Sequence, residues 1–167
     1  AVTADVIAHY FEGDQRTFLT PDYALNSPWE LLLYTLMGML AALAAVGFSR
    51  LLYFSEDMWS LVRVPEPTKP ILGGILLGVL GIFSFQVDGF PRVFGVGYDT
   101  IESSLFSQLT LQMTFGLLLL KLLATTLTLG SGGSGGIFAP SLFMGAMLGG
   151  TFGHIAHSIF PETVAPS

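Results

Sequence analysis

Two long stretches of this sequence carry no charged side chain, and they limit the folds that the chain can adopt. No Asp, Glu, Lys or Arg occurs between Lys69 and Asp88, or between Lys121 and Glu162. A bilayer core of about 30 Å is crossed by roughly 20 apolar helical residues, so each stretch is long enough to span it. Only 11% of all residues are charged, against roughly a quarter in soluble globular domains. We therefore expect an all-α, polytopic membrane protein.

Apolar segments alternate with polar, proline-rich or glycine-rich connectors, which predicts a single transmembrane domain over residues 1–167. The expected spans are residues 31–54, 71–87, 105–129 and 138–160. Residues 14–28 and 88–102 read as loops. Residues 55–70 contain Pro65, Pro67 and Pro70 and read as a polar connector between the first two spans.

The distribution of charge and the lack of cysteine exclude several classes of function. The six basic residues are scattered and form no patch, so we expect no nucleic-acid partner. Arg50, Arg63 and Lys69 flank the connector, which places it on the inner side of the membrane by the positive-inside rule. The absence of cysteine excludes disulfides and cysteine-ligated zinc. Because the chain starts at Ala1 with no signal-like segment, we expect an internal piece of a longer protein.

A glycine-rich run at residues 130–136 (GSGGSGG) lies between two charge-free apolar segments and is the most informative feature for function. Within a bilayer, non-helical backbone is tolerated only where it is buried in protein or lines a wet cavity. Pro140 suits the first turn of a following helix, where an N–H would have no partner. We expect the N–H groups of Gly136, Ile137 and Phe138 to lie unpaired at this helix N-terminus and to bind an anion, which the helix dipole favours.

The other residues of the run are expected to shape this anion site: Gly132, Gly133, Ser134 and Gly135, together with Pro140. Neutral amide donors bind an anion weakly enough to release it, which suits conduction rather than catalysis. We accordingly expect no catalytic residue, no metal and no cofactor. The alternative is a flexible linker. The apolar segment that follows argues against a linker, because glycines recur there every four residues as in a tightly packed membrane helix, at Gly145, Gly149 and Gly153.

The same segment resembles a known family. Residues 136–140 (GIFAP) match the GxFxP signature of the ClC family of voltage-gated chloride channels and chloride/proton antiporters. The SG-x-x-GG run before it, the helix LLLLKLLATTLTLGSG and the loop GVGYDTI at 95–101 are also similar to that family. The resemblance covers nearly the whole chain. It implies a partial inverted-repeat fold, transmembrane passage of chloride, and a central chloride ion bound by the amides of Ile137 and Phe138.

The resemblance also implies partners and leaves alternatives open. ClC proteins are homodimers in a lipid bilayer with one pore per subunit, and we expect a multi-pass protein of the plasma (cell inner) membrane. The family's gating glutamate motif (G-[KR]-E-G-P) and its GSGIP-type serine do not occur in this sequence. Channel and chloride/proton exchanger therefore both stay open. A carrier for another anion, such as fluoride or nitrate, is a further alternative.

Lys121 lies within the third expected span, where a cation is costly and often functional. One interpretation is a pathway charge that raises the positive potential along the route of the anion. The other is that Lys121 pairs with helix carbonyls, or with a carboxylate elsewhere in the protein.

A different class of function is an enzyme. Ser131 and Ser134 precede His154 and His157 by about twenty residues, and a serine in a glycine-rich break with a histidine downstream resembles the dyad of an intramembrane serine protease. Such a dyad needs a specific hydrogen bond and an oxyanion hole, which the sequence alone does not provide. The two histidines share a helix face but have no third metal ligand nearby. We expect them to lie at the membrane interface or to cap the last turn.

Overall fold

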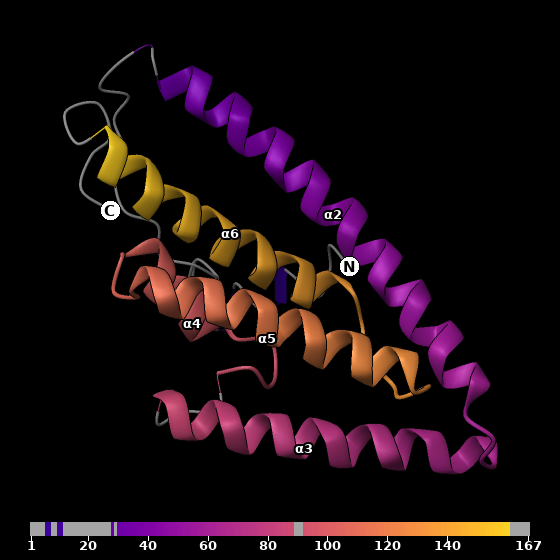
Figure 1. Cartoon of the computed structure of the whole chain (residues 1–167). Coiled ribbons are helices and arrows are strands. Elements are labelled where there is room, and N and C mark those ends of the chain that lie inside the picture. Colours follow the sequence, from indigo (N-terminus) through magenta and orange to yellow (C-terminus); the bar gives the residue numbers. More distant parts are fainter. Residues whose placement is uncertain (1–5, 8–9, 12–27, 29, 89–91, 161–167) are drawn as a thin grey trace.

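The computed structural model describes residues 6–7, 10–11, 28, 30–88 and 92–160, and every regular element among them is a helix (Figure 1). The all-α prediction is confirmed. The long helices are α2 (Glu30–Leu61), α3 (Lys69–Asp88), α5 (Leu111–Gly130) and α6 (Phe138–Ile159), with the short α4 (Tyr98–Leu105) and a 3₁₀ turn, η1 (Glu66–Thr68). The residues expected to form the loop at 14–28 lie outside the described part of the chain, apart from Pro28.

Three segments are long and apolar enough to cross a membrane: α2, residues 66–86, and α5. The fourth expected span, α6, is a helix of 22 residues that begins at Phe138 as the sequence predicted. It is not among the three segments that meet the length and hydropathy of a membrane span.

The first expected span, 31–54, lies within a longer helix. Helix α2 continues without a break to Leu61, through residues that we assigned to the connector. Its 32 residues extend for about 48 Å at 1.5 Å per residue. The physical reason is local: residues 51–61 contain neither glycine nor proline, and the first proline after them is Pro65.

The third expected span, 105–129, does not coincide with one helix, since it contains the end of one helix and most of another. Helix α4 ends at Leu105 and occupies part of the expected loop 88–102, and α5 begins only at Leu111. Between them Ser107 adopts a left-handed backbone conformation (φ 55°), which a continuous helix does not allow. Thr110 then caps α5, because its side chain accepts a hydrogen bond from the Met113 N–H at 3.4 Å.

Helix α5 lies at the centre of the helix packing. It contacts α6, α2 and α3, whereas α4 packs on α6 (Figure 1). Fully buried apolar side chains gather where α4, α5, α6 and the loop before α4 meet: Val93, Ile101, Leu109, Leu117, Ala124, Phe143 and Met147. The glycine-rich run connects α5 and α6. These two helices are in contact with each other and with α2, and they also pack against α3 or α4.

Of the three glycines expected to form a packing ridge on α6, only Gly149 closely approaches another helix in the described part of the chain. A Cβ at Gly149 would lie 3.1 Å from the Met37 side chain of α2, whereas Gly145 and Gly153 have no described neighbour within 4 Å of such an atom. The close helix approaches occur elsewhere. Gly130 at the end of α5 abuts Ser55 of α2, whose Oγ donates to the Thr126 carbonyl at 2.8 Å.

Candidate anion-binding site

The C-terminus of α5 is closed by backbone hydrogen bonds that use the first glycines of the run. The Gly132 N–H donates to the Leu129 carbonyl at 3.0 Å, and the Gly133 N–H donates to the Thr128 carbonyl at 2.9 Å. This pair of bonds is the Schellman arrangement, and it requires the left-handed conformation that Gly132 adopts (φ 83°). A side chain at Gly133 would press on the Thr128 carbonyl, since a Cβ there would lie 2.7 Å from its oxygen. Both glycines therefore turn the chain out of α5.

The start of α6 leaves consecutive backbone donors without a partner. The first bond of the new helix runs from the Ser141 N–H to the Ile137 carbonyl at 3.0 Å. Ile137 is the N-cap and contributes no side-chain cap, and Pro140 has no N–H. Within the described part of the chain, the N–H groups of Gly136, Ile137 and Phe138 donate no hydrogen bond, and all three residues are exposed. The geometry is thus a helix N-terminus whose leading N–H groups, these three included, are open.

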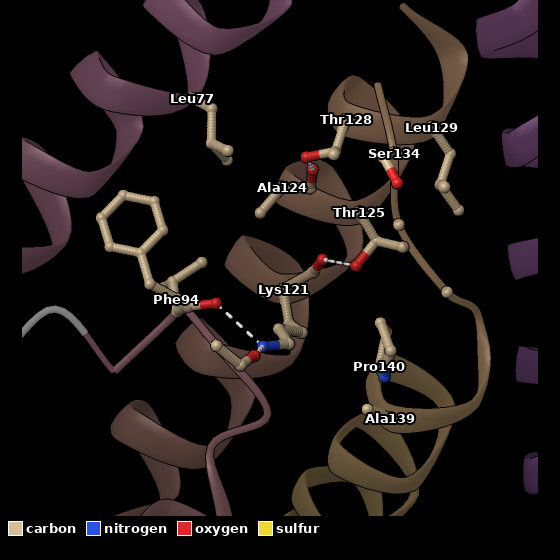
Figure 2. A pocket seen from close by; sticks show the side chains of 14 residues that line it. Leu77, Phe94, Lys121, Ala124, Thr125, Thr128, Leu129, Ser134, Ala139 and Pro140 are labelled. Carbon is tan, nitrogen blue, oxygen red and sulfur yellow. Dashed lines mark hydrogen bonds between the residues drawn. The ribbon is translucent and has the colours of Figure 1, made fainter. Parts of the chain in front are cut away.

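A cavity of about 330 Å³ lies beside this turn, between α3, α5, the loop before α4 and the start of α6 (Figure 2). Of the residues singled out in the sequence, Lys121, Ser134, Gly135, Gly136 and Pro140 line it. The remaining predicted site residues do not: Gly132, Gly133, Ile137 and Phe138. The side chains of Ile137 and Phe138 are instead 56% and 80% exposed, so it is Gly136 that joins the open donors to the cavity wall.

Lys121 reaches the cavity from the middle of α5, and its side chain is almost completely buried. Its Nζ donates to the carbonyls of Val93 at 2.9 Å and Gly95 at 2.7 Å, and it lies 4.8 Å from the centroid of the Phe143 ring. The partners are thus carbonyls, as one interpretation expected, but they belong to a loop rather than to a helix. Among the described residues no carboxylate lies within ion-pair distance of Lys121.

The arrangement required for a serine protease is not formed by the described residues. Ser131 Oγ donates to the Thr128 carbonyl at 3.0 Å, which closes the end of α5. His154 Nε2 lies 2.8 Å from the Leu109 carbonyl, on the loop that precedes α5. Ser134 lines the cavity and makes no hydrogen bond to either histidine in this part of the structure. His154 therefore connects the C-terminal part of α6 to the loop that precedes α5.

Two groups of residues that line the cavity were not predicted from the sequence. Thr125 and Thr128 follow Lys121 at spacings of four and seven, so they share its face of α5, and helical periodicity could have identified them. The lining by Val93, Phe94 and Gly95 has no comparable signal. These residues precede Lys121 by 26 to 28 positions and reach it only through the packing of the loop.

Comparison with known proteins decides the family. The family described as "Voltage gated chloride channel" matches residues 1–167, which is the whole chain. The chain belongs to the voltage-gated chloride channel family. It is 33% identical over 161 residues to a protein of Ralstonia nicotianae named as a ClcB-like chloride channel protein, covering 96% of this chain and 36% of that protein.

Two further relatives are named as a channel and as an exchanger. The chloride channel protein CLC-f of Arabidopsis thaliana is 30% identical, over 98% of this chain and 21% of its own length. The H(+)/Cl(-) exchange transporter ClcA of Yersinia pestis is 29% identical, over 96% of this chain and 33% of its own length. The chain thus spans about a third or less of the length of these relatives. Family membership and the three apolar helices together identify it as an integral membrane protein.

Proposed function

We propose that this chain forms part of the pathway by which chloride, or a similar monovalent anion, crosses a membrane. The observation that carries the proposal is that the N–H groups of Gly136, Ile137 and Phe138 are open at the start of a 22-residue helix. Membership of the voltage-gated chloride channel family supports it, as do the names of the relatives.

The energetics of a membrane interior favour an anion at this position. A backbone N–H left without a partner in hydrocarbon costs several kcal/mol, so a ligand or water must satisfy these donors. The helix N-terminus adds a positive potential equivalent to about half an elementary charge. These donors are neutral, so they attract an anion without the strong hold of a directly bound Arg or Lys, which permits release.

Each residue of the turn has a distinct part in the proposal. Gly136, Ile137 and Phe138 donate their amides to the ion, and Pro140 fixes the start of α6. Gly132 and Gly133 turn the chain out of α5 ahead of these amides. Lys121 contributes a positive charge to the wall of the adjoining cavity. No catalytic residue, cofactor or resident metal takes part.

The properties proposed for the full-length protein are those of its family. The full-length protein acts as a homodimer in the plasma (cell inner) membrane, as either a chloride channel or a chloride/proton exchanger. Fluoride or nitrate is an alternative cargo, since amide donors at a helix N-terminus are open to any small anion.

Replacing single peptide bonds by esters tests the amide donors directly in the full-length protein. An α-hydroxy acid at position 138 deletes the Phe138 N–H and keeps the side chain. A hydrogen bond to a charged group contributes roughly 1.5–3 kcal/mol, so chloride should bind about tenfold more weakly or worse. Isothermal titration of chloride and anion flux from liposomes measure the effect.

An ester at position 141 is the matched control, because the Ser141 N–H in the same turn already donates to the Ile137 carbonyl. This ester should weaken the helix slightly but leave chloride affinity close to that of the parent protein. Equal loss of affinity from both esters, or none from either, would contradict the proposed donor role.

A further inference from the structure

The loop formed by residues 92–97 is attached to α5 through Lys121. The ammonium donates to two carbonyls of this loop, those of Val93 and Gly95. Lys121 is only 3% exposed and Val93 only 2%, so the bond to the Val93 carbonyl is shielded from solvent, whereas Gly95 is exposed. A buried ammonium and a buried carbonyl are each costly without a partner, so this contact strongly favours one position of the loop.

The loop is also fitted onto the helices on either side of α5. The Phe94 ring rests on Gly81 of α3, where a Cβ would overlap it. Gly97 adopts a left-handed conformation (φ 78°) over the Phe143 ring of α6, and a Cβ there would lie 2.7 Å from that ring. The loop is thus held against α3, α5 and α6 at three points.

The same loop forms one wall of the cavity beside the open amides. Val93, Phe94 and Gly95 line the cavity together with Gly135 and Gly136 of the turn. Figure 2 shows Phe94 and Pro140 on opposite sides of Lys121. The carbonyl oxygens of Val93 and Gly95 would repel an anion if they faced the cavity unpaired, and the ammonium neutralises them.

We infer that Lys121 is a positioning residue for anion passage: it anchors the loop 92–97 as a wall of the cavity and thereby sets the size of anion that passes. The inference rests on the proposed function, since it assigns the cavity to the anion route. It differs from the role of a pathway charge, which acts through its electric field and does not require the two carbonyl bonds.

A cysteine reporter tests the anchor without reference to transport. Residues 1–167 contain no cysteine. Val93→Cys, in full-length protein with any other cysteines replaced, should resist a membrane-permeant maleimide because the position is buried. Adding Lys121→Met, which removes the ammonium at similar side-chain length, should release the loop and raise the labelling rate at least tenfold. Lys121→Arg, which keeps the charge and the donors, should restore protection.

Phe106→Cys is the control for labelling, because Phe106 lies outside the loop, is 41% exposed and should react at the same rate in all three backgrounds. If Val93→Cys stays protected in the Lys121→Met protein, the anchor is refuted. This measurement stands even if the ester experiment finds no anion at the amides, so the two proposals fail separately.

A glycine pair tests the effect on selectivity while the charge of Lys121 is kept. Gly81→Ala should displace the Phe94 ring and shift the loop, whereas Gly78→Ala, one turn earlier on α3, faces no atom within 4 Å. In liposome flux assays Gly81→Ala should change the ratio of thiocyanate to chloride permeability severalfold, and Gly78→Ala should not. An unchanged ratio in Gly81→Ala protein, or an equal change in both, would overturn the assignment of the loop as a size-determining wall.

Discussion

At the scale of single residues, buried hydroxyl groups join the two helices that flank the glycine-rich run. Thr151 of α6 donates to Thr114 Oγ1 of α5 at 3.1 Å, and Thr114 is only 1% exposed. The Thr151 hydroxyl has a single proton, which it shares between Thr114 Oγ1 and the Met147 carbonyl at 2.8 Å, whereas Thr114 donates to the Leu111 carbonyl at 3.0 Å. The sequence placed these threonines on helices, but their pairing across 37 positions is a product of packing.

Removing this pair should weaken the α5–α6 contact by a modest amount. Interhelical hydrogen bonds in membrane proteins contribute about 0.6 kcal/mol on average, so we expect Thr114→Val and Thr151→Val to be coupled by roughly that free energy. A double-mutant cycle on unfolding in mixed micelles measures the coupling. Thr35→Val is the control, since its hydroxyl bonds only to Leu31 within the exposed face of α2. A coupling of zero would mean that the two hydroxyls are independent.

At the scale of helices, the sequence predicted where α6 starts better than where α2 ends. The start of α6 at Phe138 was predictable because glycines end the preceding helix and Pro140 suits the first turn of the next one. The end of α2 was not predictable, because the polar residues from Ser55 onward resemble a connector but contain no glycine or proline before Pro65. The division between α4 and α5 falls at residues 106–110, which also contain no glycine or proline. The helix crossings, in turn, depend on which glycine meets which neighbour.

Gly130→Ala tests the crossing of α2 and α5. The added methyl would collide with Ser55 and disturb its bond to the Thr126 carbonyl, which should destabilise the protein by about 1–3 kcal/mol. Gly116→Ala on the same helix meets no atom within 4 Å and should be neutral or stabilising by up to about 1 kcal/mol. Thermal unfolding in detergent measures both. Equal stability of the two variants would contradict a tight crossing at Gly130.

At the scale of the whole molecule, α2 shows how the chain meets its surroundings. Only 6% of its most apolar window is buried, compared with 33% for α5, so its apolar side chains face outward. Its length of about 48 Å exceeds the roughly 30 Å of a bilayer core. Because Glu56 and Asp57 lie near its C-terminus, we expect that end to emerge from the membrane, on the inner side according to the basic residues that follow.

Single cysteines on α2 test this placement. Ser60→Cys should react with a membrane-impermeant thiol reagent applied from the inner side only. Leu43 is 69% exposed in the structure. A cysteine at this position (Leu43→Cys) should nevertheless stay unlabelled from either side, because lipid or the remainder of the protein covers it. Labelling of Leu43→Cys at the rate of Ser60→Cys would show that α2 faces water, and labelling of Ser60→Cys from outside only would reverse the orientation.

The sequence by itself determined that the chain lies in a membrane, that it is helical, and that the helix is interrupted between residues 130 and 140. Long charge-free segments require a bilayer, and the glycines and proline between residues 130 and 140 interrupt the helix whatever surrounds them, because these are steric properties of the local chain. Only the tertiary structure decided what the buried charge does. Lys121 needs hydrogen-bond partners somewhere, but carbonyls 26 and 28 residues away become those partners only when the 92–97 loop packs between α3 and α6.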